Sequence, residues 1–138
     1  MQAIPYEEKV RRYPEFQRLL SEKFDYNWDA YEVKTEDGWY LSLFRIRSKE
    51  NEKEGLGPHE FPDDYEVKYP LLFVHGAYDS AYGFISRYNI FDKVWSLKMV
   101  DAGYDVWLYN ARGNKHSDRN EQDGEWTLKE YWDFNWAD

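Results

Sequence analysis

Hydrophobic residues near the start of the chain recur with helical spacing. Between Pro5 and Phe24, Arg and Glu lie on one face, and the other face consists of Val10, Tyr13, Phe16 or Gln17, Leu20 and Phe24. This spacing is close to the 3.6-residue period of an amphipathic helix. Pro14 would break a single helix, because it lacks an N–H and restricts the residue before it. The pattern therefore predicts two short helices that meet at Tyr13–Pro14.

The next stretch has the composition of β-structure. Residues 31–35 and 39–47 are rich in β-branched and aromatic side chains, and they flank the three residues Glu36-Asp37-Gly38. A three-residue loop with Gly where a positive φ is needed is typical of a β-hairpin. Residues 48–68 contain two Gly, two Pro, seven acids and three bases, which predicts an acidic surface loop.

From residue 69 onward the pattern is that of an α/β protein. The apolar run Leu71–Val74 is typical of a strand buried on both faces of a parallel sheet. A helix is predicted from about Asn89 to Ala102, capped by Gly103, and a further strand covers 105–110. The predicted apolar face of this helix is Phe91, Val94, Trp95, Met99 and Ala102. A hairpin followed by strand, crossover helix and strand predicts the α/β class and the opening half of a predominantly parallel sheet.

Composition narrows the possible functions. The chain has 138 residues, no cysteine, 20% aromatic residues and a net charge of -9, so it suits one folded acidic domain without disulfides. A chain this acidic is not expected to bind nucleic acid, which requires clustered Lys and Arg. Its start lacks the apolar region of a secretory signal, and it has no apolar run of about 20 residues. We therefore expect an intracellular or organellar location, including a membrane-associated complex.

Two loops carry candidate chemistry. His75-Gly76 follows the apolar strand, at the end where open α/β sheets bind ligands. Gly76 would let the backbone turn sharply and present the next N–H to a ligand or an oxyanion. The alternative is a tight turn with a His packed beneath it. The second loop, 109–117, follows the next strand and contains Arg112, which either lines a site at the same edge or pairs with a carboxylate.

Four blocks of the sequence, taken together, resemble the acid lipase family of α/β-hydrolases. They are TEDGWYLSLFRI, LLFVHGAYDS, DAGYDVWLYNARGNKHS and YWDFNWAD, in the family's order, and they cover most of residues 31–138. Residues 1–24 and the acidic loop match the family poorly. The resemblance implies that the N–H of Ala77, after His75 and Gly76, is one donor of an oxyanion hole. It also implies that Leu is more usual at position 77 and that the loop 110–113 is scaffold beside the acyl site.

The catalytic triad of such a hydrolase has no counterpart in this sequence. No G-x-S-x-G elbow occurs, although the class uses Ser, then Asp or Glu, then His in chain order. His75 and His116 belong to the early motifs, and His59 lies in the acidic loop. His59-Glu60 with Asp63-Asp64 is interpreted as solvated loop and not as a metal site. The sequence thus predicts no catalytic residue, no cofactor and no metal, with Ala77, His75 and Gly76 as the relic of an oxyanion hole.

These observations lead to two hypotheses about function. The first is a non-catalytic, acid-lipase-derived subunit of a larger assembly. The alternative is the N-terminal portion of a serine ester hydrolase acting on triacylglycerols or steryl esters, with the triad supplied by downstream sequence or another chain. In both, residues 1–30 form a helical extension and 31–138 the N-terminal half of an α/β-hydrolase domain. The strand Leu71–Val74 is then an open apolar edge, which we expect another protein chain to cover.

Overall fold

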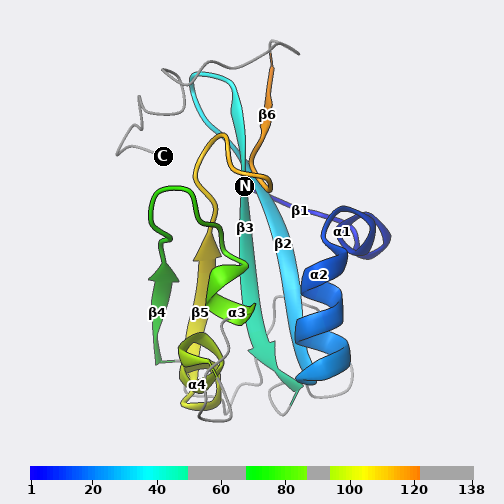
Figure 1. Ribbon diagram of the computed structural model, residues 1–138, viewed down its shortest axis with the longest axis vertical. Helices are drawn as coiled ribbons and strands as arrows, with labels where there is room; N and C mark the ends of the chain where they lie inside the picture. Colours follow the sequence, from blue (N-terminus) through cyan, green and yellow to red (C-terminus); the bar gives the residue numbers. More distant parts are fainter. Residues whose placement is uncertain (50–67, 87–93, 122–138) are drawn as a thin grey trace.

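The computed structural model describes residues 1–49, 68–86 and 94–121. Within these residues, a six-stranded sheet has the order β1-β2-β3-β5-β4, and β6 pairs with the start of β3 (Figure 1). The strands are β1 (Gln2–Ala3), β2 (Tyr26–Lys34), β3 (Trp39–Ser48), β4 (Lys68–Phe73), β5 (Tyr104–Tyr109) and β6 (Arg119–Asn120). The helices are α1 (Tyr6–Arg12), α2 (Pro14–Phe16), the π-helix η1 (Gln17–Lys23), α3 (Gly83–Ser86) and α4 (Trp95–Asp101).

The pairing pattern is that of an α/β sheet with a hairpin and two parallel strands, as the sequence predicts. β4 and β5 run parallel, and the remaining described strand pairs are antiparallel. The described sheet is therefore mixed and not predominantly parallel. The hairpin and the two parallel strands joined through α3 and α4 are confirmed as its components.

The hairpin is longer than the sequence pattern indicated. β2 and β3 pair from Tyr26 opposite Ser48 to Lys34 opposite Tyr40. β2 begins before residue 31 because Tyr26, Trp28 and Ala30 continue the alternation and bury their side chains in the core. The turn is confirmed, since Gly38 has a φ of 91° that other residues adopt at a cost.

The break between the first two helices is also confirmed. α1 ends at Arg12, Tyr13 has a non-helical φ of -131°, and α2 begins at Pro14. Pro at the first position of a helix is favourable because its missing N–H would have had no partner there. The expected domain boundary at residue 30 stays a prediction, and β2 runs across that position. Most of the acidic loop 48–68 lies outside the described residues.

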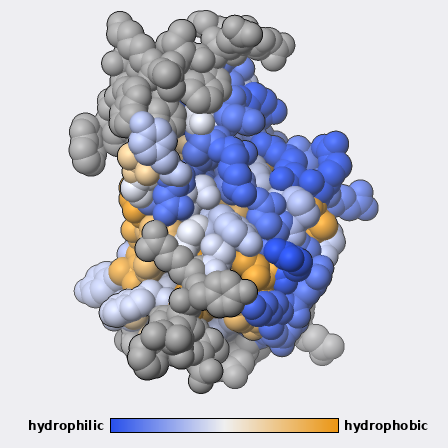
Figure 2. Space-filling model, viewed as in Figure 1, coloured by the Kyte–Doolittle hydropathy of each residue, from blue (hydrophilic) through white to orange (hydrophobic). Residues whose placement is uncertain are grey.

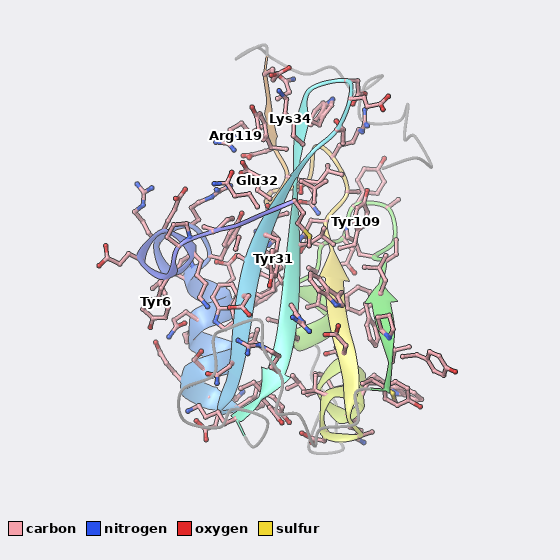
Figure 3. All side chains as sticks on the ribbon, turned by 180° about the vertical axis from the view of Figure 1, so that it is seen from behind. Tyr6, Tyr31, Glu32, Lys34, Tyr109 and Arg119 are labelled. Atoms are coloured by element: carbon pink, nitrogen blue, oxygen red, sulfur yellow. The ribbon has the colours of Figure 1, made fainter. Side chains whose placement is uncertain are left out.

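The helices pack against one face of the sheet. Side chains from α2, η1, α3 and α4 share a buried cluster with the inward-facing side chains of β2, β3 and β5, among them Phe16, Leu20, Trp28, Phe44, Ile85, Leu97 and Leu108. Figure 1 shows this covered face, and Figure 3 shows the other face, over which no described helix lies. A second, smaller cluster of Trp39, Leu41 and Tyr109 lies outside that core.

The expected apolar face of the helix before Gly103 is only partly confirmed: Val94 is buried and Met99 packs against the core, but Trp95 and Ala102 are exposed. Trp95 is 69% exposed, whereas Ser96, Leu97 and Val100 are buried. α4 starts at Trp95, after Val94 in an extended conformation, so its buried stripe is rotated by one residue from the expected one. Gly103, with a φ of 87°, ends the helix as predicted. Residues 89–93 of the expected helix lie outside the described residues.

The expectation that Leu71–Val74 is buried on both faces was wrong for this chain. β4 pairs only with β5 among the described strands. Phe73 packs toward the core, while Leu72 and Val74 are 58% and 55% exposed. Figure 2 shows hydrophobic surface along the margin where β4 lies in Figure 1, whereas the opposite margin over α1 is largely hydrophilic. Among the described strands, β4 is thus an apolar edge, as the sequence predicted.

Candidate functional site

The parallel pairing of β4 and β5 brings the two candidate loops together. Phe73 at the end of β4 lies opposite Leu108 near the end of β5. Because parallel strands end at the same edge of a sheet, the loops that follow them are neighbours. The loop after β4 contains His75, and the loop after β5 is 110–117. The expectation that both face one edge is confirmed by direct hydrogen bonds between them.

The His75 ring joins the two loops. Its Nε2 lies 3.0 Å from the backbone N of Ala111 and 3.0 Å from Nδ2 of Asn114. Its Nδ1 lies 2.8 Å from the carbonyl oxygen of Gly76. The side chain is half-buried. His75 therefore spans from the second loop to the backbone of its own turn.

Two asparagines form the buried support beneath His75. Asn110 is fully buried, donates from Nδ2 to the Ser42 carbonyl at 3.1 Å, and accepts at Oδ1 from the N–H of Ala81 at 3.0 Å. Asn114 donates from Nδ2 to Asn110 Oδ1 at 3.1 Å. This network ties β3 and the loops after β4 and β5 into one unit. Buried polar networks whose members are satisfied add rigidity to a site.

The turn after His75 has its left-handed residue two positions beyond Gly76. Gly76 does not have a positive φ, and a Cβ at this position would meet nothing within 4 Å. The left-handed residue is Tyr78, with a φ of 63°. The turn begins at Gly76, whose carbonyl accepts from the Asp79 N–H at 3.2 Å, and it does so without a left-handed glycine. Open space beside Gly76 leaves its backbone accessible.

Ala77 is exposed at the carboxyl end of β4. Within the described part of the chain, its backbone N–H has no hydrogen-bond acceptor, while the neighbouring Asp79 N–H donates to the Gly76 carbonyl at 3.2 Å. An accessible N–H without an acceptor can bind a negatively charged oxygen. Its assignment as an oxyanion donor stays a prediction.

Arg112 has a structural role. It is 3% exposed, and its NH1 and NH2 lie 2.6 and 3.3 Å from the two carboxylate oxygens of Asp37 in the hairpin turn. The Arg112 hydrogen bond is the main reason that the pKa of Asp37 is lowered from its ordinary value. Pairing with a carboxylate, the alternative weighed for Arg112, is confirmed. The loop after β5 is thereby fixed to the hairpin.

His116 is buried in the core below this loop. Its ring lies 5.3 to 5.9 Å from the rings of Tyr13, Phe16 and Phe44. Burial, followed by the nearby charge of Lys115, lowers the pKa of His116 to about 4. Its Nε2 has no hydrogen-bond partner in the described ranges and lies 3.7 Å from Glu15 Oε1. His116 is thus a neutral core residue at pH 7.

The other candidate features are the predicted acidic loop and one cavity. His59-Glu60 and Asp63-Asp64 lie outside the described residues, and the described ones contain no cluster of three or more His, Asp or Glu suited to a metal ion. A cavity of about 520 Å³ lies away from His75, between α1, η1 and β2, and is lined in part by Lys9, Trp28 and Arg47.

Residues 18–88, which include His75 and Ala77, match a family model described as the partial alpha/beta-hydrolase lipase region. This match covers more than half of the chain and extends from η1 to the end of α3. The chain belongs to the acid lipase family of α/β-hydrolases. The resemblance stated from the four sequence blocks is confirmed.

Relatives across animals and fungi are lipases by name. The chain is 35% identical over 117 residues to Lipase 1 of Drosophila melanogaster, a match covering 85% of this chain and 22% of the relative. It is 38% identical over 96 residues to gastric triacylglycerol lipase of Rattus norvegicus, covering 69% and 21%. It is 31% identical over 110 residues to a probable lipase of Schizosaccharomyces pombe, covering 80% and 22%. The chain therefore spans about a fifth of the length of these relatives.

Sequence reasoning found the two loops of this acid lipase region but missed the residues that hold them together. Asn110 and Asn114 were treated only as part of a scaffold loop, and Ser42 as a strand residue. Ser117 donates from Oγ to the Asn110 carbonyl and accepts from the Ser42 N–H at 3.0 and 2.8 Å. The available signal was the run of short polar side chains just after a strand end, since such residues often bond to backbone groups.

Proposed function

We propose that this chain is the N-terminal portion of a serine ester hydrolase and that the Ala77 N–H is one donor of its oxyanion hole. The observation that carries the proposal is the position of this N–H, exposed at the carboxyl end of β4 on a turn held by His75. Donors held in place before the reaction stabilise the tetrahedral intermediate of acyl transfer. The nucleophile, the acid and the general base would come from downstream sequence or another chain.

The open side of the sheet supports this proposal. Leu72, Val74 and Tyr69 are exposed on or next to β4, at 58%, 55% and 85%. A long apolar edge strand would promote association in a protein whose sheet ended there. A further strand beside β4 would bury these side chains and would lie next to the open space at Gly76. A nucleophile on that strand could then approach the Ala77 N–H.

The relatives favour an ester hydrolase over an accessory subunit. Gastric triacylglycerol lipases of four mammals are among them, and the proposed substrates of the whole protein are accordingly triacylglycerols or steryl esters. A non-catalytic subunit stays the competing hypothesis. One feature that supports it, the exposed edge of β4, is equally expected of a hydrolase that lacks its next strand.

An activity assay separates the two hypotheses. The chain is expressed alone and with its natural continuation or co-purifying chains, then assayed with a short acyl ester and labelled with a fluorophosphonate. The proposal predicts no hydrolysis by residues 1–138 alone, and hydrolysis with a labelled serine when they are completed. A completed protein that folds, binds no fluorophosphonate and cleaves no ester would refute it and favour the accessory subunit.

We also propose that the edge strand β4 is covered in the functional protein, either by the continuing chain or by another one. If residues 1–138 formed a monodisperse, soluble monomer with one cooperative thermal transition, this coverage would be unnecessary. No helix in the described ranges is long and apolar enough to cross a membrane. The intracellular or organellar location stays a prediction.

A further inference from the structure

The orientation of the Asn114 amide is fixed by its neighbours. Its Oδ1 accepts from the backbone N–H groups of His116 and Ser117 at 2.8 and 3.1 Å. A carbonyl oxygen accepts and an amide nitrogen donates, so only one assignment of the two ends satisfies these donors. The Nδ2 end therefore points toward Asn110 Oδ1, at 3.1 Å, and His75 Nε2, at 3.0 Å.

This arrangement determines which nitrogen of His75 carries the proton. Nε2 faces two groups that can only donate, namely the Asn114 Nδ2 and the backbone N–H of Ala111. Nε2 must then be the unprotonated, accepting nitrogen of a neutral imidazole. The proton lies on Nδ1, which donates to the Gly76 carbonyl oxygen at 2.8 Å.

The hydrogen bond from Nδ1 fixes a peptide plane and not merely a side chain. The Gly76 carbonyl and the Ala77 N–H belong to the same peptide unit, and no cis peptide bond occurs in the described residues. In a trans peptide these two groups point in opposite directions. The Gly76 oxygen is held by His75 and by the Asp79 N–H, at 3.2 Å. Holding this oxygen therefore directs the Ala77 N–H away from the turn.

We propose that Asn114 is a positioning residue: together with the Ala111 N–H it selects the His75 tautomer that holds the Gly76–Ala77 peptide ready to bind an oxyanion. The role of the Ala77 N–H rests on the proposed function, whereas the tautomer is a property of this chain. This role explains why the loop after β5 contains the buried amide of Asn114, although the loop does not contact the reacting atoms. It also explains how an exposed turn keeps one orientation.

The first test measures the tautomer directly on the full chain. Long-range proton–nitrogen NMR correlations distinguish a protonated from an unprotonated ring nitrogen. The expected result is a protonated Nδ1 and an unprotonated Nε2 on His75. A dominant Nε2–H tautomer in the unaltered protein would overturn the inference, and this measurement needs no variant that has to fold.

The second test replaces the hydrogen-bond donor that Asn114 presents to His75 by an acceptor. Asn114→Asp keeps the Oδ1 acceptor for His116 and Ser117 but replaces the donor facing His75 by an acceptor. The His75 proton should shift measurably from Nδ1 to Nε2. Lys115→Met is the matched control, since it removes the ion pair of the same loop with Glu15 but leaves the His75 contacts in place. An unchanged tautomer in Asn114→Asp, or an equal shift in the control, would contradict the proposal.

The third test links the tautomer to catalysis in the completed enzyme. Because the oxyanion forms only during the reaction, Asn114→Asp should lower kcat at least about tenfold with little change in KM. Lys115→Met should leave kcat within about twofold. If the completed protein hydrolyses esters but Asn114→Asp shifts the tautomer without lowering kcat, the positioning role fails and the proposed function stands. If it hydrolyses no ester, the proposed function fails and the NMR result still decides the tautomer.

Discussion

One margin of the sheet ends in a short strand with paired charges beside it, whereas the other ends in exposed apolar side chains. On the first, β1 pairs with β2, the Lys9 ammonium donates to the Trp28 carbonyl, and Lys9 lies 3.8 Å from Asp29. On the second, β4 pairs with β5 on one side, has no described strand on its other side, and leaves Leu72 exposed. Natural sheets protect true edges with short strands and charged residues. The first margin therefore has the features of a sheet edge, whereas the apolar side chains of the second are those typical of an interior strand.

The largest expected effect contrasts a core residue with an edge residue. Phe44 is fully buried among Tyr13, Phe16 and Trp28, so Phe44→Ala should lower the free energy of unfolding by about 3–5 kcal/mol. Leu72→Ala, at an exposed position of β4, should change it by less than about 0.5 kcal/mol. Denaturant unfolding of the chain measures both. A large loss in Leu72→Ala would show that β4 is already covered in solution.

The next largest effect is a loss of folding stability at acid pH, caused by the buried His116. The folded state keeps His116 neutral, with a pKa of about 4, whereas the unfolded chain takes up a proton near its ordinary value of 6.5. Stability contributed by the neutral ring is therefore full above pH 6.5 and is lost as the pH falls toward 4, by at most about 3 kcal/mol.

Unfolding measured between pH 7 and 5, above the range where most carboxylates titrate, isolates this contribution. His116→Gln should remove most of the slope in that interval. Equal slopes in the two proteins would mean that His116 is accessible to protons without unfolding, and that the core below the loop is looser than its contacts with Tyr13 and Phe16 indicate.

A moderate effect on stability is expected from removing the charge of Lys9, which lies beside β2 at the margin that β1 forms. Lys9→Met keeps the length of the side chain but loses the charged hydrogen bond to Trp28 and the attraction to Asp29. We expect a loss of about 1.5–3 kcal/mol in the free energy of unfolding. Lys23→Met, at an exposed position of η1, is the control and should stay within about 0.5 kcal/mol. Comparable losses in both would remove the distinction between the buried Lys9 of α1 and any surface lysine.

The smallest effect on stability is expected at Gly76. Its φ is not positive and a Cβ has open space, so Gly76→Ala should leave the thermal midpoint of residues 1–138 nearly unchanged. In the completed hydrolase, the same substitution should lower activity, because the proposed neighbouring strand would fill that space. If Gly76→Ala strongly destabilised residues 1–138, the need for glycine would come from the turn itself. If the completed hydrolase kept its activity, the neighbouring strand would not approach Gly76 closely.

The candidate site shows how far sequence patterns reach. The ends of the strands and the motif at His75 could be predicted, because a buried strand and the turn after it leave local signals. The contact between His75 and Asn114 could not, since it joins residues 39 positions apart. It depends on the parallel register of β4 and β5 and on the amide orientation that His116 and Ser117 impose.

Local stereochemistry determined several features from the sequence alone. Pro14 ends one helix and starts another, Gly38 takes the left-handed conformation of the hairpin turn, and Gly103 ends α4. Each follows from the allowed dihedral angles of a single residue. The order of the sequence blocks was likewise enough to assign the family, because homology is carried by the residues themselves.

Only the tertiary structure decided which surfaces are covered. In the structure, Trp95 is not part of the buried face of α4, Leu72 is exposed, and His75 accepts a hydrogen bond from the loop after β5. Burial depends on what stands opposite a side chain, and the same apolar run can be a core strand or an edge according to its neighbours. The sequence of β4 is that of an interior strand, and its place at the end of the described sheet is why its apolar side chains remain exposed.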